Sequence, residues 1–450
     1  MQARDIALEV LNFLDKGPLL PEQCLDRAFK RYPHVTRRDR AFTYGLVQGV
    51  CRWRSRLDWI IRQNLQFSFK KIEPRVLNVL RIALFQIYFM DRVPQSAAVN
   101  EAVRQAKWIS KGPAVKFVNG ILRQICRQKQ EIVFPDKKSE PVQFLSIFYS
   151  YPLWLVKKWI KELGIGPAES LMEAGNGIPH MVVRTNRLKI ERTGLIELLE
   201  KEGVSARPTD YSPDGIQVDG LKGRVTRLEV FRKGLFQVQS EAAQLCSHLL
   251  NPGAEESVLD LCAGLGGKST HLAEMMGGKG RIVSLDINHT RLIKLLESSL
   301  RLGIGCIHPF VADAGKHLSW LKYRSFDKIL VDGPCSGLGV LSRHPDGKWS
   351  RDENDIKRLS ILQKSIMREA VPVLKKGGKL LYVTCTLSKE ENEGVVNGFL
   401  KSNKGMCLVN LNEDTPEGVS TFIDDQGFFR TLPHVHGMDG FFAALFYKQD

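Results

Sequence analysis

Two cysteines in the second half of the chain stand where a thiol could do chemistry. Cys385 follows the apolar run "LLYVT" and precedes the polar run "TLSKEENE". Cys335 follows a second apolar run, in "ILVDGPCSGLG". A free cysteine is most often a buried packing residue, but a packing residue belongs within a strand, whereas both of these come just after one. The pattern therefore predicts two thiols in turns at the ends of strands, where one could serve as a nucleophile.

The stretch after Cys385 predicts how the chain leaves that strand. Ser388 and Glu391 have the spacing of a capping box, in which two side chains satisfy backbone N–H groups at the start of a helix. We therefore expect a helix to begin near Ser388, so that Cys385 lies between the end of a strand and the start of a helix.

Aspartates end four apolar runs in the same half of the chain. Asp260 ends "SVLD", Asp286 ends "RIVSLD", Asp313 ends "FVAD" and Asp332 ends "ILVD". The carboxyl ends of parallel strands form one edge of a sheet, where ligands bind, and an acid after the second strand commonly accepts hydrogen bonds from ribose hydroxyls. The glycine-rich turn "CAGLGG" after the first run lacks the G-x-G-x-x-G spacing of dinucleotide binders. The sequence thus predicts a site for a nucleoside-like cofactor and disfavours NAD.

A pair of thiols beside such a cofactor suits methyl transfer to C5 of cytosine. That carbon is a poor nucleophile until a thiolate adds at C6 and turns the ring into an enamine. After methylation a second group must take the C5 proton as a base, while an acid near N3 can stabilise the charge that develops. The residues alone leave open which of the two cysteines attacks.

Hydrophobic periodicity divides the chain into parts that would position these residues. Residues 1–130 read as amphipathic helices separated by prolines, and residues 131–145 read as a polar linker. Residues 146–236 mix helices with short alternating runs, which predicts a small α+β module. Over residues 237–450, strand-like runs alternate with helices, which predicts an α/β domain with a parallel, doubly wound sheet.

Positive charge is concentrated in the helical first part. The chain carries +16 at pH 7, and residues 1–130 hold 24 Lys and Arg against 10 Asp and Glu, whereas the rest holds 41 against 39. Arginines lie among aromatics in "CRWRSRLDW", a combination that favours nucleic acid through phosphate contacts and stacking. Nine cysteines without a Cys-x-x-Cys pair disfavour a zinc site and a disulfide framework. With no signal region and no long apolar run, we expect a cytosolic protein that does not enter a membrane.

The motifs "DGPCSG", "RHPDGKW" and "TCTLSKEENE" together resemble those of the RNA cytosine-5 methyltransferases of the Sun/Fmu group, within the NOL1/NOP2/Sun family. The resemblance covers essentially the whole chain, and residues 1–130 resemble the NusB-like helical domain that this group carries. It implies a Rossmann-like catalytic domain over residues 237–450, S-adenosylmethionine as cofactor and no metal. It also implies a monomer that acts on 16S ribosomal RNA, free or in a partly assembled small subunit.

The resemblance further implies a role for each matching residue. Cys385 would attack C6, Cys335 would assist release of the methylated base, and Asp332 would lie near the cytosine and the methyl group. Asp286 would hold the ribose and Asp313 the adenine edge. The backbone of the glycine-rich turn would surround the methionine part of the cofactor: Cys262, Ala263, Gly264, Leu265, Gly266, Gly267 and Lys268. The alanine-proline pair usual in this turn is Gly264-Leu265 here, a departure that removes no chemical group.

Two alternatives stay open at the level of the sequence. One is the same chemistry on another RNA such as transfer RNA, although the family members that act there usually lack a NusB-like domain. The other is a non-enzymatic RNA-binding factor in ribosome assembly that carries an unused methyltransferase fold. The presence of both cysteines, Asp332 and the glycine-rich turn argues against the second.

Overall fold

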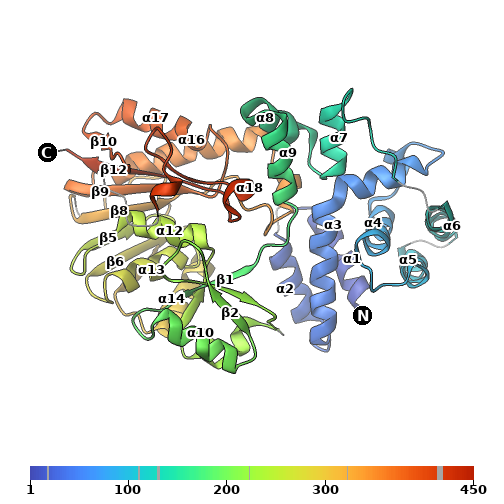
Figure 1. Cartoon of the computed structure of the whole chain (residues 1–450), viewed down its shortest axis with the longest axis horizontal. Helices are drawn as coiled ribbons and strands as arrows, with labels where there is room; N and C mark the ends of the chain where they lie inside the picture. Colours follow the sequence, from blue (N-terminus) through green and yellow to red (C-terminus); the bar gives the residue numbers. More distant parts are fainter. Residues whose placement is uncertain are drawn as a thin grey trace. The chain divides into compact units, whose positions relative to one another are not determined.

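The structure, a computed structural model (Figure 1), describes residues 1–17, 20–109, 112–128, 132–221, 223–321, 323–412 and 419–449. Contacts divide the chain into two compact units. Unit 1 comprises Met1–Asn176 and His344–Ser350, and unit 2 comprises Gly177–Arg343 and Arg351–Asp450. None of the described helices is both long and apolar enough to cross a membrane.

Unit 1 is helical throughout, as the periodicity predicts. Its helices are α1 (Ala3–Leu14), α2 (Pro21–Arg31), α3 (Arg37–Gln63), α4 (Pro74–Phe89), α5 (Gln95–Ile109), α6 (Pro113–Gln128), α7 (Pro141–Phe148), α8 (Leu153–Leu163), α9 (Ile165–Ala174) and the short α15 (Gly347–Ser350), with a 3-10 turn at Phe69–Lys71. Several of them begin with proline, which fits the first helical position because its missing N–H would have no partner there. The apolar faces of α1, α3 and α4 share one core that includes Ile6, Leu46 and Leu80.

The linker expected over residues 131–145 falls partly outside the described chain. Its first residue, Glu131, is not among the described residues, and its last part, from Pro141, begins α7.

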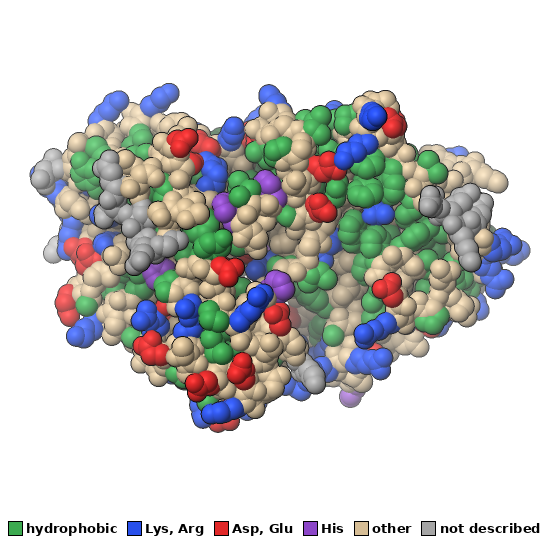
Figure 2. Space-filling view, viewed as in Figure 1, with side chains coloured by type: hydrophobic (Ala, Val, Ile, Leu, Met, Phe, Trp, Pro, Cys, Tyr) green, Lys and Arg blue, Asp and Glu red, His purple; other side chains and the backbone are tan. Residues whose placement is uncertain are grey.

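On the face seen in Figure 2, Lys and Arg side chains are spread over many parts of the surface rather than gathered in one patch.

Unit 2 begins with a small antiparallel sheet of strand order β2-β3-β1-β4. The strands are β1 (Met181–Thr185), β2 (Ser205–Pro208), β3 (Gly215–Asp219) and β4 (Phe236–Val238). Helix α10 (Arg192–Lys201) packs Leu195 and Leu199 against Val183 and Ile216 of this sheet. The short α11 (Glu229–Arg232) and a 3-10 turn (Val225–Arg227) precede β4. The sequence predicts a small α+β module over residues 146–236, and the sheet confirms its presence, but residues 146–176 at the start of that range belong to unit 1.

The rest of unit 2 is built on a larger sheet of order β10-β12-β9-β8-β5-β6-β7, with β11 paired to β12. Its strands are β5 (Ser257–Asp260), β6 (Arg281–Asp286), β7 (Ile307–Val311), β8 (Phe326–Asp332), β9 (Leu374–Thr384), β10 (Met406–Leu408), β11 (Phe429–Thr431) and β12 (Phe441–Lys448). The strands β5 to β9 pair in parallel. The last strand β12 runs antiparallel to β9, so the sheet is mixed rather than wholly parallel as expected.

Helices cover both faces of the larger sheet because side chains alternate sides along a strand. Leu381 and Val383 of β9 pack with α12 (Glu241–Leu250), α13 (Gly267–Met275) and α14 (His289–Leu302). Leu380 and Tyr382, on the opposite side of the same strand, pack with α16 (Glu353–Ala370) and α17 (Glu393–Ser402). A short helix α18 (Pro433–His436) and a 3-10 turn (Ser420–Phe422) complete the unit.

The carboxyl ends of the parallel strands carry the polar residues that the sequence singles out. Strands β5, β6 and β8 end at Asp260, Asp286 and Asp332, and β9 ends directly before Cys385. Strand β7 ends two residues before Asp313. In the order β9-β8-β5-β6-β7 the chain changes direction across the sheet between β8 and β5, and such switch points are where open α/β sheets bind ligands.

Candidate active site

The two cysteines of the sequence motifs meet at this edge of the sheet. The Sγ atoms of Cys335 and Cys385 lie 3.1 Å apart, and both side chains are partly buried. Backbone hydrogen bonds join their loops, because Gly333 N donates to Val383 O at 2.9 Å and Gly339 N donates to Cys385 O at 3.0 Å. The contact with the Cys385 thiol, together with burial, raises the pKa of Cys335 well above its usual value. Only one member of such a pair ionises readily, since two thiolates at this distance repel each other.

The expected capping box at Ser388 and Glu391 is wrong. Helix α17 begins at Glu393, and the Glu391 side chain turns inward instead of capping it. Its Oε1 accepts a hydrogen bond from Ser336 N at 2.8 Å, and its Oε2 accepts one from Thr386 Oγ1 at 3.1 Å. The spacing matches the capping pattern, but the carboxylate instead accepts hydrogen bonds from Ser336 and Thr386, which follow the two cysteines in the chain.

Lys268 contributes a side chain to the site, not just the backbone that the sequence analysis assigned. Its Nζ donates to Asp332 Oδ2 at 2.6 Å and lies 5.2 Å from the centre of the Phe441 ring. Burial lowers the pKa of Lys268, whereas the charge of Asp332 and the hydrogen bond to it raise this pKa. The net effect is a raised pKa. The ion pair therefore fixes the carboxylate of Asp332, which shortly precedes Cys335 in the chain.

The glycine-rich turn between β5 and α13 is held by two aspartates. Asp286 Oδ2 accepts a hydrogen bond from Gly264 N at 2.9 Å, and its Oδ1 accepts one from Asn288 N at 2.7 Å. Asp260 lies beneath the turn, where Ser269 Oγ donates to its Oδ2 at 2.6 Å. Burial, with a smaller effect of the Asp332 charge, raises the pKa of Asp260 to about 7. The sequence analysis placed Asp260 at the end of a strand but assigned it no role toward the cofactor or the base.

The turn leaves space where a ligand could approach the backbone. Gly264 has φ +56°, and a Cβ added there or at Gly267 would meet no other atom within 4 Å. At Gly266, with φ +80°, an added Cβ would instead lie 2.5 Å from Leu295 Cγ, so this glycine is required for packing.

Asp313 completes the polar edge from the end of β7. It follows the strand that pairs with β6, and its Oδ1 accepts a hydrogen bond from Gly315 N at 3.0 Å. Carboxylates on neighbouring strands beside an open glycine turn fit the positive and hydroxyl-bearing groups of S-adenosylmethionine.

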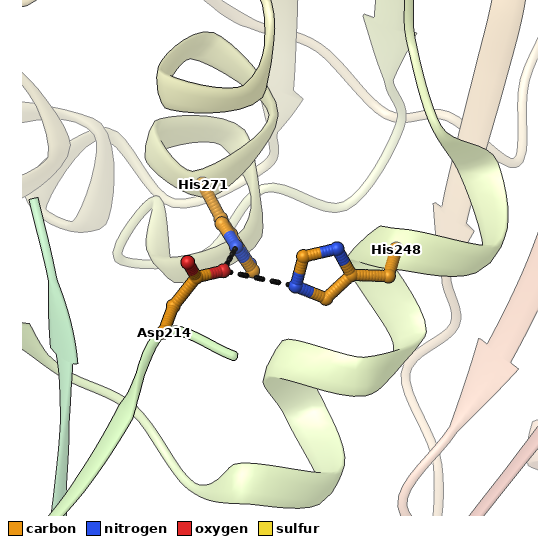
Figure 3. Close-up of side chains that lie close together, drawn as sticks. All are labelled: Asp214, His248 and His271. Carbon is orange, nitrogen blue, oxygen red and sulfur yellow. Dashed lines mark hydrogen bonds and ion pairs between the residues drawn. The ribbon is translucent and has the colours of Figure 1, made fainter. Parts of the chain in front are cut away.

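A separate cluster in unit 2 joins Asp214, in the loop before β3, to His248 of α12 and His271 of α13 (Figure 3). The two imidazole Nε2 atoms lie 2.9 and 3.2 Å from Asp214 Oδ2. These hydrogen bonds hold the pKa of Asp214 well below its usual range despite burial, while burial lowers the pKa of His271 to about 3. The three ligand atoms lie within 4.8 Å of one another.

The cluster is better explained as an internal link than as a metal site. A cation would replace both hydrogen bonds to Asp214 and would face the guanidinium of Arg187, which lies 3.6 Å from the other carboxylate oxygen. The cluster instead ties the small sheet to the helices that pack on the larger one.

All of the "RHPDGKW" motif except Arg343 belongs to unit 1. Lys348 is buried, and its Nζ bonds Asn176 Oδ1 at 2.6 Å and the carbonyl oxygens of Arg52 and Ser150 at 3.2 Å each. It also lies 3.7 Å from the centre of the Tyr151 ring. Burial, with a smaller effect of the Arg52 charge, lowers its pKa well below the usual value.

A mixed Rossmann-like sheet with a glycine turn and acidic strand ends is typical of methyltransferases that use S-adenosylmethionine. Comparison with protein families agrees across the chain. Residues 1–127 match the NusB family, residues 151–222 match a ferredoxin-like domain of RsmF/B-like methyltransferases, and residues 247–447 match the 16S rRNA methyltransferase RsmB/F family.

Relatives extend over the full length. A "Probable ribosomal RNA small subunit methyltransferase B" of Bacillus subtilis is 35% identical over 99% of this chain and 98% of its own. A "Ribosomal RNA small subunit methyltransferase B" of Pectobacterium carotovorum is 34% identical over 99% of this chain and 98% of its own. The chain belongs to the RsmB/F family of methyltransferases.

Solved structures show the same architecture. The crystal structure of a protein called PH0851 matches 100% of this chain and 99% of its own with a TM-score of 0.82 and 27% identity. The structure of NSun6 from Pyrococcus horikoshii, solved with SFG, matches 67% of this chain and 100% of its own with a TM-score of 0.59 and 26% identity.

Proposed function

We propose that this enzyme transfers a methyl group from S-adenosylmethionine to C5 of a cytidine in 16S ribosomal RNA, through a covalent bond between Cys385 and C6 of the base. The observation that carries the proposal is the thiol pair, 3.1 Å apart, on the sheet edge that also holds the glycine turn and the Lys268–Asp332 ion pair. The names of the full-length relatives support the substrate.

The chemistry divides between the two thiols. S-adenosylmethionine supplies an electrophilic methyl group when it is bound. The Cys385 thiolate adds to C6, which moves an electron pair to C5 and makes that carbon nucleophilic. After transfer, the Cys385 sulfur is bonded to C6 and carries no charge, so Cys335 can lose its proton to water and its thiolate can take the proton from C5. The C5–C6 double bond then reforms, and the bond between C6 and the Cys385 sulfur breaks to return the Cys385 thiolate. While the Cys385 thiol is free, its contact and burial keep Cys335 protonated by raising its pKa, so Cys335 is the poorer nucleophile at neutral pH.

The acids of the strand ends hold the two ligands. Asp286 accepts hydrogen bonds from the ribose hydroxyls and Asp313 lies at the adenine edge, while the backbone of residues 262–268 surrounds the methionine part. Asp332, fixed by Lys268, lies near the cytosine and the methyl group. These roles rest on the family resemblance and on the positions of the residues along one sheet edge.

The rest of the chain serves RNA binding. Residues 1–130 carry 24 basic and 10 acidic side chains, which favours phosphate contacts, and the module predicted over residues 146–236 provides a second RNA-binding part. The base enters the site unpaired or flipped out of its helix. We place the reaction in the cytoplasm, with a monomer acting on free 16S RNA or on a partly assembled small subunit.

The test is methyl transfer from labelled S-adenosylmethionine to 16S RNA and to transfer RNA, followed by nucleoside digestion and mass spectrometry. We expect 5-methylcytidine in 16S RNA, loss of the product in Cys385→Ala, and full activity in Cys407→Ala, whose thiol lies away from the site on β10. Label on another atom of the nucleoside, or on transfer RNA alone, would contradict the proposal. No transfer to any RNA would leave a binding protein.

A further inference from the structure

The carboxylate of Glu391 is bonded to the residue that follows each cysteine in the chain. Ser336 donates its backbone N–H to Oε1 at 2.8 Å and its hydroxyl to Oε2, and Thr386 donates its hydroxyl to Oε2 at 3.1 Å. The two hydroxyls also lie 2.8 Å from each other. One buried side chain thus connects the loop of Cys335 to the loop of Cys385.

Gln363 of α16 extends this connection to the residue before Cys335. Its Nε2 donates to Glu391 Oε1 at 3.1 Å and to Pro334 O at 2.9 Å. The peptide on each side of Cys335 is therefore bonded to one network, which we call the Glu391 network: Ser336, Gln363, Thr386, Glu391 and Asn392.

Asn392 does for Cys385 what Gln363 does for Cys335. Thr384 Oγ1 donates to Asn392 Oδ1 at 2.6 Å, and Asn392 Nδ2 donates to Thr386 O at 3.0 Å. Residues on both sides of Cys385 are therefore fixed by the side chain next to Glu391. The Glu391 backbone is itself attached to β9, because Tyr382 Oη donates to its carbonyl oxygen at 2.6 Å.

A buried carboxylate at this position lowers the stability of the fold unless its hydrogen bonds compensate for the loss of hydration. Glu391 is fully buried, and burial raises its pKa even though several donors stabilise the charge. Apolar side chains could fill the same space without that cost. A satisfied buried polar network does something they cannot, since its directional bonds specify one arrangement of the loops that it joins.

The geometry points to Glu391 as a positioning residue that sets the distance and orientation of the Cys335 and Cys385 thiols relative to each other. The inference rests on the proposed two-thiol reaction, in which one sulfur must reach C6 while the other serves the adjacent C5. Loops that drifted apart would separate attack from release, and methyl transfer would slow although the cofactor site, held by the separate bonds of Asp260 and Asp286, stayed intact.

The experiment compares Glu391→Gln with a matched control, Glu393→Gln, which removes a carboxylate that pairs with Arg430 instead. The amide keeps the volume of Glu391 but replaces Oε2 with an N–H₂ group. This group faces the hydroxyls of Ser336 and Thr386, which donate to Oε2 in the wild type. We expect single-turnover methyl transfer to slow about 10- to 100-fold in Glu391→Gln and S-adenosylmethionine affinity, measured by calorimetry, to change less than about twofold. Glu393→Gln should match the wild type in both.

A second readout reports the thiol geometry without catalysis. Phenylarsine oxide bridges two neighbouring thiols, and its arsenic–oxygen bond is replaced by two arsenic–sulfur bonds with release of water. Intact-mass measurement should show one arsenical on wild type and on Glu393→Gln, absent from Cys335→Ala, and bound about tenfold more weakly to Glu391→Gln, a loss of the size expected for one or two misaligned hydrogen bonds.

The outcomes separate this inference from the proposed function. If the wild type transfers methyl groups and Glu391→Gln equals Glu393→Gln in rate and arsenical binding, Glu391 does not position the thiols. If the wild type transfers nothing, the proposed function fails, while the arsenical still tests the network. Should Glu391→Gln not fold, Thr386→Val removes one hydroxyl at constant volume, and unchanged arsenical binding and rate there would overturn the inference.

Discussion

Among the residues that the structure describes, two lysines are buried, and their surroundings shift their pKa values in opposite directions. Lys268 of unit 2 pairs with a carboxylate, Asp332, and its pKa is raised. Lys348 of unit 1 is bonded to an amide oxygen, two carbonyl oxygens and an aromatic ring, and its pKa is lowered well below the usual value. A buried ammonium beside a carboxylate stays protonated because the opposite charge raises its pKa. One that is buried among neutral acceptors loses its proton more readily because its pKa is lowered. We propose that the first belongs to the reacting site and the second to a structural one.

The largest effect expected from this comparison is on activity. Lys268→Met removes the partner of Asp332 and frees that carboxylate to move or to repel the developing thiolate. Methyl transfer should fall at least about 100-fold, because a positioned charge at a reacting centre commonly contributes that much. Single-turnover rates measure it, and a loss below about threefold would show that the ion pair is structural only.

Lys348→Met should act on stability instead. The substitution removes the hydrogen bonds that Lys348 donates to buried oxygens of unit 1, so the free energy of unfolding should fall by about 1–3 kcal/mol at pH 9–10. Urea titration measures the loss. Methyl transfer per folded molecule should stay near that of the wild type, and a large fall in it would break the distinction between the two lysines.

The pH dependence of stability should separate the two lysines by sign, as a smaller effect. The folded pKa of Lys348 lies below the ordinary 10.5, so its protonation favours the unfolded chain, and the stability it contributes falls as pH drops below 10.5. The folded pKa of Lys268 lies above 10.5, so its contribution is complete below that pH and is lost as pH rises through the folded pKa. The destabilisation by Lys348→Met should therefore shrink as pH falls from 10 to 7, whereas that by Lys268→Met should not. Urea titrations across this range that showed the same slope for both variants would contradict the assignment.

The same comparison shows what could be read from the sequence. The thiols and strand-end aspartates could be predicted, because β-strand runs and the turns after them are local features, and parallel strands bring their ends together. The partner of the Lys268 side chain lies 64 residues away, and Ser336, next to Cys335, is bonded to Glu391, 55 residues later in the chain. No local pattern reveals such bonds, and at Glu391 the local pattern predicted a helix cap that tertiary donors displaced.

The departures in fold have a similar origin. The antiparallel strand β12 was not predicted, since its apolar run pairs with β9 only after the sheet is assembled. The assignment of His344–Ser350 to unit 1 also depends on distant acceptors, among them the carbonyl of Arg52. Periodicity identifies elements, whereas pairing and the burial of single charges are settled by contacts between them.

The most direct test of the central claim uses the two thiols separately. Cys335→Ala and Cys385→Ala are each mixed with 16S RNA and S-adenosylmethionine and run on denaturing gels. We predict a stable protein–RNA adduct with Cys335→Ala, because the attacking thiol remains while release is impaired, and no adduct with Cys385→Ala. An adduct with Cys385→Ala and none with Cys335→Ala would exchange the two roles and contradict the assignment of Cys385 as the nucleophile.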